Sequence, residues 1–351
     1  MPISDFTLGL AVAGGLVLAG VVAHGAWNAR RNTPRQAHPG DDQPSLDPIQ
    51  PRELLEPRMD SDALSGPGDV SDLPLPEKKA TLDALIDVIA PIALDDAVSG
   101  EAALGAMPPT RRVGSKPFAI EGLNAAYRQW EVPANGQRYD AFQAGVQLAN
   151  RSGALNDIEY SEFVIKTQAF ADALNGAPEF PEMRDEVARA RELDSFAGDH
   201  DAQLSFTIRA RHTAWSPGFI AQNAARLGFV AGVIPGRMVL PASTLGMPPI
   251  LGLGFDTQAA LAEDPTQAAV REVTLSLDVP QVERAERPFV RMRESAAALA
   301  QAMDGVVTDD NGQPLAADAM DVIGSELEKL YDTLDDRDLA AGSVLARRLF
   351  S

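Results

Sequence analysis

The sequence predicts an α+β protein with an N-terminal transmembrane helix, a disordered linker and two related antiparallel-sheet domains that carry helices on one face. Three observations support this. Residues 6–29 contain no Asp, Glu, Lys or Arg, residues 32–76 hold nine of the chain's 26 prolines, and each later part runs strand, helix, several strands, helix. That last order favours an antiparallel sheet with helices packed on one side. The expected domain boundaries are 1–31, 32–78, 79–195 and 196–351.

The apolar run at residues 6–29 is long enough for a membrane-spanning helix. At about 1.5 Å per residue it crosses a hydrocarbon core of about 30 Å. A cleaved signal peptide would need a basic segment before a shorter apolar core, and no Lys or Arg precedes Phe6. Arg30, Arg31 and Arg35 follow the run, so the positive-inside rule places the N-terminus outside and the remaining chain in the cytoplasm.

Small residues recur every four positions in this run, at Ala11, Gly15, Ala19 and Ala23. They share one helix face, and small residues at that spacing let two membrane helices approach closely, which would give a homodimer. An Ala- and Gly-rich helix also produces such a series by chance, so both interpretations stay open.

The linker is expected to be disordered and partly extended. It is rich in Pro, Asp and Ser and has few aromatic or β-branched residues. Such a segment cannot bury enough apolar surface to offset the entropy lost on ordering. Its expected role is reach, letting the folded part sample the space beneath the membrane.

Composition excludes several classes of partner and site. The formal net charge of -20 argues against nucleic acid or an anionic lipid surface as a partner, because both need clustered Lys and Arg. The chain has no Cys, which excludes a disulfide framework and a thiolate metal site and suits a reducing compartment.

The first folded unit is expected to begin near Lys79. Its predicted elements are, in order, a buried strand at 84–92, a helix at 95–107, strands at 116–120, 127–132 and 142–148, a helix at 157–174 and an exposed helix at 181–193. Pro108-Pro109 ends the first helix, and Asn175-Gly176 is typical of the end of the second.

The second unit is expected to begin near His200. Its predicted strands lie at 204–208, 229–234, 237–240, 250–255, 273–279 and 306–307, and its helices at 217–227, 288–303 and 316–334. Leu204, Phe206 and Ile208 alternate with polar residues, so they share one face of the sheet.

The two units resemble each other in sequence. Residues 144–176 align without a gap on 273–305, and the first strands match at a slightly different offset that pairs Ile86 with Phe206. A diverged tandem repeat explains this pattern. Any two strand-then-helix units share part of such a pattern, so coincidence is the competing explanation.

Catalytic constellations are largely absent from the sequence. His200 and His212 stand without a serine elbow or a metal-type histidine spacing, and no phosphate-binding glycine loop is present. Asp309-Asp-Asn-Gly312 lacks the alternating ligands of a cation loop and is typical of a tight turn. We therefore expect no catalytic residue, metal or cofactor, and a binding module is the favoured class of function.

A sheet with helices on one side leaves its other side open for a helix or an extended peptide. The candidate binding residues lie on or beside strands of the second unit: Leu204, Phe206, Ile234, Phe255, Thr257, Leu275 and Ser276. For each apolar residue in this set, membership of the ordinary core is the alternative.

Several segments, taken together in order and spacing, resemble the ZipA family of membrane-anchored bacterial cell-division proteins that bind the tubulin-like FtsZ. They are His24-Gly-Ala-Trp27, Gly228-Phe-Val230, Pro249-Ile-Leu-Gly-Leu253, Val273-Thr-Leu-Ser-Leu-Asp-Val-Pro280 and Gly305-Val-Val-Thr-Asp-Asp310. The resemblance covers the anchor, the linker and roughly residues 200–334. It does not plainly cover residues 79–195.

The resemblance implies an inner-membrane protein of the division septum, whose cytoplasmic domain holds the C-terminal peptide of FtsZ on an apolar sheet face. The family's groove positions fall on Leu204, Phe206, Ile234, Phe255, Thr257 and Ser276. Thr257 and Ser276 are polar or small where the family's groove is larger and apolar. This departure favours a second hypothesis, a membrane-anchored scaffold for another envelope or divisome protein without FtsZ binding. A third, an anchored hydrolase, lacks a catalytic set.

Overall fold

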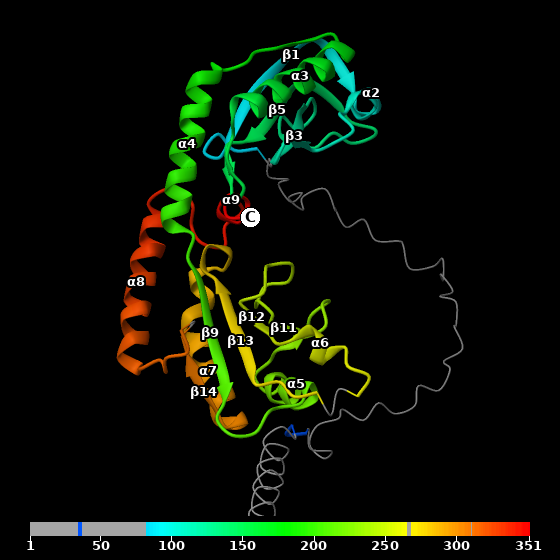
Figure 1. The fold of residues 1–351 in the computed structure, drawn as a ribbon. Coiled ribbons are helices and arrows are strands. Elements are labelled where there is room, and N and C mark those ends of the chain that lie inside the picture. Colours follow the sequence, from blue (N-terminus) through cyan, green and yellow to red (C-terminus); the bar gives the residue numbers. More distant parts are fainter. Residues whose placement is uncertain (1–33, 37–81, 265–267, 310) are drawn as a thin grey trace, which may run out of the picture. The chain divides into compact units, whose positions relative to one another are not determined.

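The computed structural model describes residues 34–36, 82–264, 268–309 and 311–351. The chain divides into two compact units between Gly198 and Asp199, with residues 34–36 belonging to the later one. We call residues 82–198 the first unit, and residues 199–351 together with 34–36 the second unit. Both are mixed α+β, with antiparallel sheets and helices (Figure 1).

The first unit contains strands β1 (Asp87–Ser99), β2 (Arg112–Val113), β3 (Lys116–Asn124), β4 (Trp130–Glu131), β5 (Arg138–Gln147), β6 (Ala149–Asn150), β7 (Gly153–Ala154) and β8 (Gly176–Pro178). Its helices are α2 (Gly100–Ala106), α3 (Asp157–Ala173) and α4 (Met183–His200), the last of which ends two residues past the boundary. The sheet order is β2-β3-β5-β1-β8, and the paired strands are antiparallel. Helix α3 packs on β5 and β8 (Figure 1).

The second unit contains strands β9 (Gln203–Ala210), β10 (Val230–Ala231), β11 (Arg237–Leu240), β12 (Leu251–Gly254), β13 (Glu272–Asp278) and β14 (Gly305–Thr308). Its α-helices are α5 (Pro217–Ala225), α6 (Thr257–Ala260), α7 (Pro288–Met303), α8 (Ala317–Asp335) and α9 (Val344–Leu349). The sheet order is β10-β11-β12-β13-β9-β14. Helix α7 packs on β9, β13 and β14.

The two sheets share one topology. The order β2-β3-β5-β1-β8 corresponds strand for strand to β11-β12-β13-β9-β14, which supports the repeat hypothesis. Val146 and Leu275 are equivalent in the ladders, and their partners on the first strands are Val88 and Phe206. The expected match of Ile86 with Phe206 is therefore two residues out of register. Because side chains alternate with a period of two, this slip keeps the same face inward.

Two elements of the first unit differ from the expectation. The predicted helix at 95–107 begins only at Gly100, because β1 resumes pairing with β5 at Val98 and Ser99 after an irregularity. The Ser99 hydroxyl then accepts from the Ala102 N–H as a helix cap. The predicted strand at 127–132 shrinks to β4, because the Asn124 side chain accepts two backbone N–H groups and turns the chain.

The predicted anchor at 6–29 and its small-residue stripe lie outside the described residues. Within the described ranges, no helix combines the length and the apolar character needed to span a membrane. Most of the predicted linker also lies outside them. The exception is residues 34–36, which were expected to be disordered and instead pair with the second unit through Trp215.

Candidate functional site

The two faces of the second unit's sheet differ sharply in character. Along β9 and β13, Phe206 pairs with Leu275 and Val273 with Ile208, and all four side chains are buried beneath α7. The intervening residues point to the opposite side, because successive side chains of a strand alternate. Among its described strand residues, the unit therefore has one helix-covered apolar face and one face without buried large side chains.

A single row of residues crosses the uncovered face from strand to strand. The ladder register places Val230 beside Val239, Val239 beside Gly252, Gly252 beside Ser276, and Ser276 beside Ser205. None of the five is buried. We call these five residues the open-face row; apolar at its β10 end, it becomes small and hydroxyl-bearing at its β9 end.

The floor of this row is shallow at its centre. The Ser276 hydroxyl lies 3.4 Å from the Gly252 carbonyl oxygen, to which it donates. A Cβ added at Gly252 would come within 2.7 Å of the same hydroxyl, so only glycine fits beside Ser276 without rearrangement. At the β9 end a shallow cavity of about 400 Å³ is lined by Gln203, Leu204, Ser205, Ser276, Leu277 and Asp278. An extended backbone can lie close to such a floor.

The expectation that Phe206 lies on the open face is wrong. Phe206 is only 3% exposed, and its ring meets Phe289 of α7 edge-on, with 6.3 Å between centroids. Leu204 belongs to the same apolar row but is half-buried at the end of the strand, where it borders the shallow cavity with Ser276. Leu275 is core. The alternation correctly predicts that Leu204, Phe206 and Ile208 share one face of the sheet, but that face lies beneath α7 and not on the open side.

Three other predicted residues gather at the far end of the sheet. Ile234 is 60% exposed in the loop between β10 and β11, and this loop contacts the chain after β12 through a hydrogen bond from Phe255 N to Gly236 O of 2.9 Å. A Cβ at Gly236 would approach the backbone of Phe255 and Thr257. Thr257 is exposed and begins α6. The structure thus places Phe255 and Thr257 beside the β10–β11 loop that carries Ile234.

Sequence reasoning missed four members of the open-face row, namely Val230, Val239, Gly252 and Ser205. The alternation along β9 and β13 held the signal for Ser205, but the others required the register between strands.

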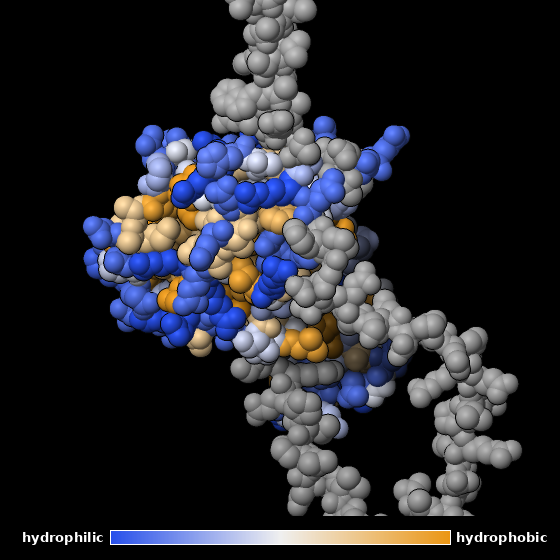
Figure 2. All heavy atoms as spheres, turned by 90° about the horizontal axis from the view of Figure 1, so that it is seen from below, coloured by the Kyte–Doolittle hydropathy of each residue, from blue (hydrophilic) through white to orange (hydrophobic). Residues whose placement is uncertain are grey.

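Figure 2 views the molecule from below Figure 1, toward the end of the second unit that carries α5. There apolar side chains form separate patches between hydrophilic ones.

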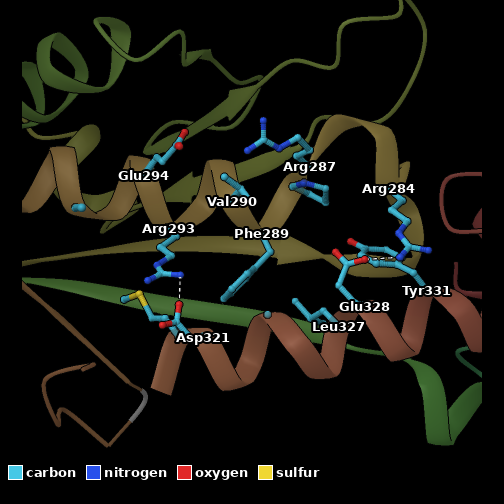
Figure 3. Close-up of a pocket in the computed structure, with 14 residues that line it drawn as sticks. Arg284, Arg287, Phe289, Val290, Arg293, Glu294, Asp321, Leu327, Glu328 and Tyr331 are labelled. Carbon is cyan, nitrogen blue, oxygen red and sulfur yellow. Dashed lines mark hydrogen bonds and ion pairs between the residues drawn. The ribbon is translucent and has the colours of Figure 1, made fainter. Parts of the chain in front are cut away.

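A larger cavity, of about 650 Å³, lies between α7 and α8 on the covered side of the sheet (Figure 3). Ion pairs join the two sides: Arg293 to Asp321 at 2.5 Å, and Arg284 to Glu328 and Asp332. Phe289 points from α7 into the space between the helices. The arrangement suits apolar contact flanked by charge, and it offers no chemistry of its own.

Tyr331 lines the same cavity and is 3% exposed. Burial is the main cause that raises the pKa of its hydroxyl, with Glu328 adding to the effect. Among the described residues this hydroxyl has no hydrogen-bond partner, and the Arg284 guanidinium lies 5.6 Å from the ring centroid. The sequence had marked 316–334 only as a helix, so this tyrosine was not singled out.

The first unit holds a buried polar network around Lys116. Its Nζ donates to Asn150 Oδ1 at 3.0 Å and to Ser115 Oγ at 2.9 Å, and Ser115 Oγ donates to Glu159 at 2.8 Å. Burial lowers the pKa of Lys116. A serine beside a lysine can be a nucleophile, but here the hydroxyl already donates to Glu159, which also caps α3 with Asn156. The network ties the β2–β3 loop to α3.

Across the ranges that the structure describes, no group of three or more His, Asp or Glu is placed to hold a metal ion.

Residues 261–326 match the family described as ZipA, C-terminal FtsZ-binding domain. The matched stretch contains β13, α7, β14 and the first part of α8, and hence Ser276 of the open-face row. No curated protein matches the chain. The family's description is that of a binding domain, which is consistent with the expectation of a non-enzyme. The resemblance inferred from the sequence is confirmed over this stretch, so residues 261–326 are ZipA-like.

Proposed function

We propose that this protein is a cell-division adaptor that binds FtsZ through the second unit and is tethered to the inner membrane by residues 6–29. The match of residues 261–326 to an FtsZ-binding domain supports the partner. The uncharged apolar run followed by Arg30 and Arg31 supports a tether with a periplasmic N-terminus, cytoplasmic units and a septal location. A homodimer through Ala11, Gly15, Ala19 and Ala23 remains a further hypothesis.

The open-face row is the observation that carries the proposed mode of binding. A five-residue path crosses five adjacent strands without a buried large side chain. The C-terminal peptide of FtsZ would lie along it, with its apolar side chains on Val230 and Val239 and its backbone near the hydroxyls of Ser205 and Ser276. Little apolar area is available, so each contact is weak, and avidity on an FtsZ polymer supplies the retention.

Co-pelleting tests this proposal. The full chain in lipid nanodiscs is mixed with polymerised FtsZ, with and without the FtsZ C-terminal peptide. We expect recovery in the pellet only when the peptide is present. Ser276→Arg, which places a long charged side chain on the row, should abolish recovery, and Ser325→Arg on the exposed surface of α8 should not. Equal recovery with tail-less FtsZ would reject binding through the tail.

The polar centre of the row favours one alternative, a membrane-anchored scaffold for another envelope protein without FtsZ binding. Gly252, Ser276 and Ser205 supply almost no apolar surface where a groove of this family is expected to be apolar. A fluorescent fusion separates the two functions. A band at the division site supports the adaptor, whereas an even envelope signal supports the scaffold.

A further inference from the structure

Residues 34–36 lie against the second unit through an isolated β-bridge at Arg35, far along the chain from their partners. Arg35 N donates to Ala214 O at 2.7 Å, and Ser216 N donates to Arg35 O at 2.9 Å, which makes a parallel bridge between Arg35 and Trp215. On its other side Trp215 exchanges two hydrogen bonds with Val270. Trp215 is thus the central residue of two adjoining β-bridges, and Arg35 covers one side of its backbone.

The edge that Arg35 covers is buried. Ala214 and Trp215 are 0% exposed and Ser216 is 2% exposed. Buried backbone groups need partners, and an uncovered edge exposes a row of unpaired donors and acceptors. Removal of residues 34–36 would take the partners from the Ala214 carbonyl and the Ser216 N–H. The second unit is therefore complete only with this segment in place.

The side chain of Arg35 fits the C-terminal end of α7. Its Nη1 donates to Met303 O at 3.3 Å, and its Nη2 pairs with the Asp304 carboxylate at 3.2 Å. The C-terminus of a helix carries partial negative charge, so a cation is favoured there. Trp215 Nε1 donates to the same Met303 carbonyl at 2.7 Å, and His212 contacts the same carboxylate. Both partners of the ion pair are half-exposed, so backbone pairing carries the docking and the side chain sets its register.

We propose that residues 34–36 are a docking strap, which holds the second unit directly behind the basic segment Arg30–Arg31 rather than at the free end of the linker. Arg35 lies five positions after Arg30, and a chain of that length spans at most about 18 Å. The reach expected of the linker is then not available to the second unit.

The docking itself is independent of FtsZ binding. Only its consequence, a second unit held close to the membrane, rests on the anchor proposed above. If the strap is docked but co-pelleting fails, the proposed partner is wrong and this inference stands. If co-pelleting succeeds and the strap is not docked, the proposed partner stands and this inference is wrong.

Trypsin tests the strap on the full chain in detergent micelles. Cleavage between Arg35 and Gln36 is compared with cleavage of the same bond in a synthetic peptide of residues 30–42. A docked strand must open before a protease can bind it, so we expect the bond in the protein to be cut at least about tenfold more slowly. Equal rates would overturn the proposal. Protection that falls on dilution would assign the strap to a second copy of the chain and also overturn it.

Amide hydrogen exchange at Ser216 supplies the matched comparison. Arg35→Pro removes the N–H that donates to Ala214, and we expect exchange at Ser216 to accelerate at least about tenfold. Gln36→Pro introduces the same residue one position later and removes neither bond to residues 214–216, so exchange should stay near that of the unaltered chain. Asp304→Asn keeps the backbone pairing and should accelerate exchange by only about two- to threefold. Equal exchange in the two proline variants contradicts the strap.

Discussion

Among the residues that the structure describes, the face opposite the packed helix is occupied in the first unit and uncovered in the second, although the two sheets share one topology. In the first unit, Leu82 lies over Gly145 on that face, and its backbone N–H donates to buried Glu121 at 3.2 Å. Gln143 donates to the same carboxylate at 2.8 Å. In the second unit, the corresponding face carries the open-face row. A repeated fold can thus present a surface in one copy and fill it in the other.

This difference favours the second unit as the proposed binding unit. In the first unit, this face is filled by internal contacts of the Glu121 carboxylate with the Gln143 amide and with the backbone of Leu82. The second leaves Ser205, Gly252 and Ser276 accessible in one register. The match of residues 261–326 falls on the unit with the uncovered face.

The largest expected effect tests which face of the second sheet is core. Phe206→Ala should destabilise the second unit by about 3–5 kcal/mol, because it removes a buried aromatic ring that packs on Phe289. Ser276→Ala, on the adjacent strand but on the open face, should change stability by less than about 0.5 kcal/mol. Urea unfolding followed by tryptophan fluorescence measures both, since Trp215 lies in this unit. Similar costs for the two variants would reverse the assignment of the faces.

The second effect tests the cover of the first sheet. Leu82→Ala should cost about 2–4 kcal/mol, since Leu82 is 7% exposed and fills the space over Gly145. Leu85→Ala is the matched control, because Leu85 is 38% exposed, and it should cost less than about 1 kcal/mol. Amide exchange in β5, measured for each variant, localises the loss to the first unit. A Leu82→Ala protein as stable as the control would show that this face is not held closed by Leu82.

Alkaline pH is expected to weaken the first unit. Burial raises the pKa of Tyr160 to about 12, whereas an unfolded tyrosine titrates near 10. The folded state therefore holds more protons between pH 10 and 12, so rising pH favours unfolding across that window by about 1–2 kcal/mol. Thermal unfolding at pH 9 and pH 11.5 measures the loss. Tyr160→Phe should reduce it, and an unchanged slope in that variant would assign the loss elsewhere.

At neutral pH the two units can be compared through one buried tyrosine in each, Tyr160 in the first and Tyr331 in the second. The Tyr160 hydroxyl donates to the Pro181 carbonyl, whereas among the described residues the Tyr331 hydroxyl has no hydrogen-bond partner. Tyr160→Phe should cost about 1 kcal/mol, and Tyr331→Phe should be neutral or slightly stabilising, because a buried polar group without a partner carries a desolvation cost. Chemical denaturation at pH 7 measures both. A larger loss for Tyr331→Phe would indicate a partner in the α7–α8 cavity.

The smallest expected effect concerns binding. Ser276→Leu adds apolar area to the centre of the open-face row and should tighten binding of the FtsZ C-terminal peptide about two- to fivefold. Fluorescence anisotropy with a labelled peptide measures the change. Ser325→Leu makes the same substitution on α8 and should leave affinity unchanged. Equal changes of affinity in the two variants would show that the open-face row is not part of the binding site.

Much of the fold was predictable because local patterns match it. The predicted helix at 288–303 coincides with α7, and the predicted strand at 204–208 lies within β9. Proline at the first turn and a strictly alternating strand are local signals that need no distant partner. The helix predicted at 95–107 failed for the opposite reason: residues 98–99 are held extended by pairing with β5, a contact across about forty residues.

The candidate site was harder to predict. The alternation of Leu204, Phe206 and Ile208 shows that they share a face, but it cannot show whether that face meets α7 or solvent. The row from Val230 to Ser205 exists only through the register of four strand pairs. For residues 34–36, composition favours disorder, and the buried edge that orders them lies about 180 residues away at Trp215.

By itself the sequence determined the class of fold, most helices and strands, the ZipA-like character of residues 261–326 and the absence of a thiol site. These depend on the hydrophobic period, the composition and the order of elements along the chain, which short stretches of sequence contain without their distant partners. Only the tertiary structure decided which sheet face is covered, which unit keeps an accessible row and where Arg35 docks. Those outcomes depend on contacts between residues far apart in the chain, and burial and backbone pairing are defined only once those residues meet.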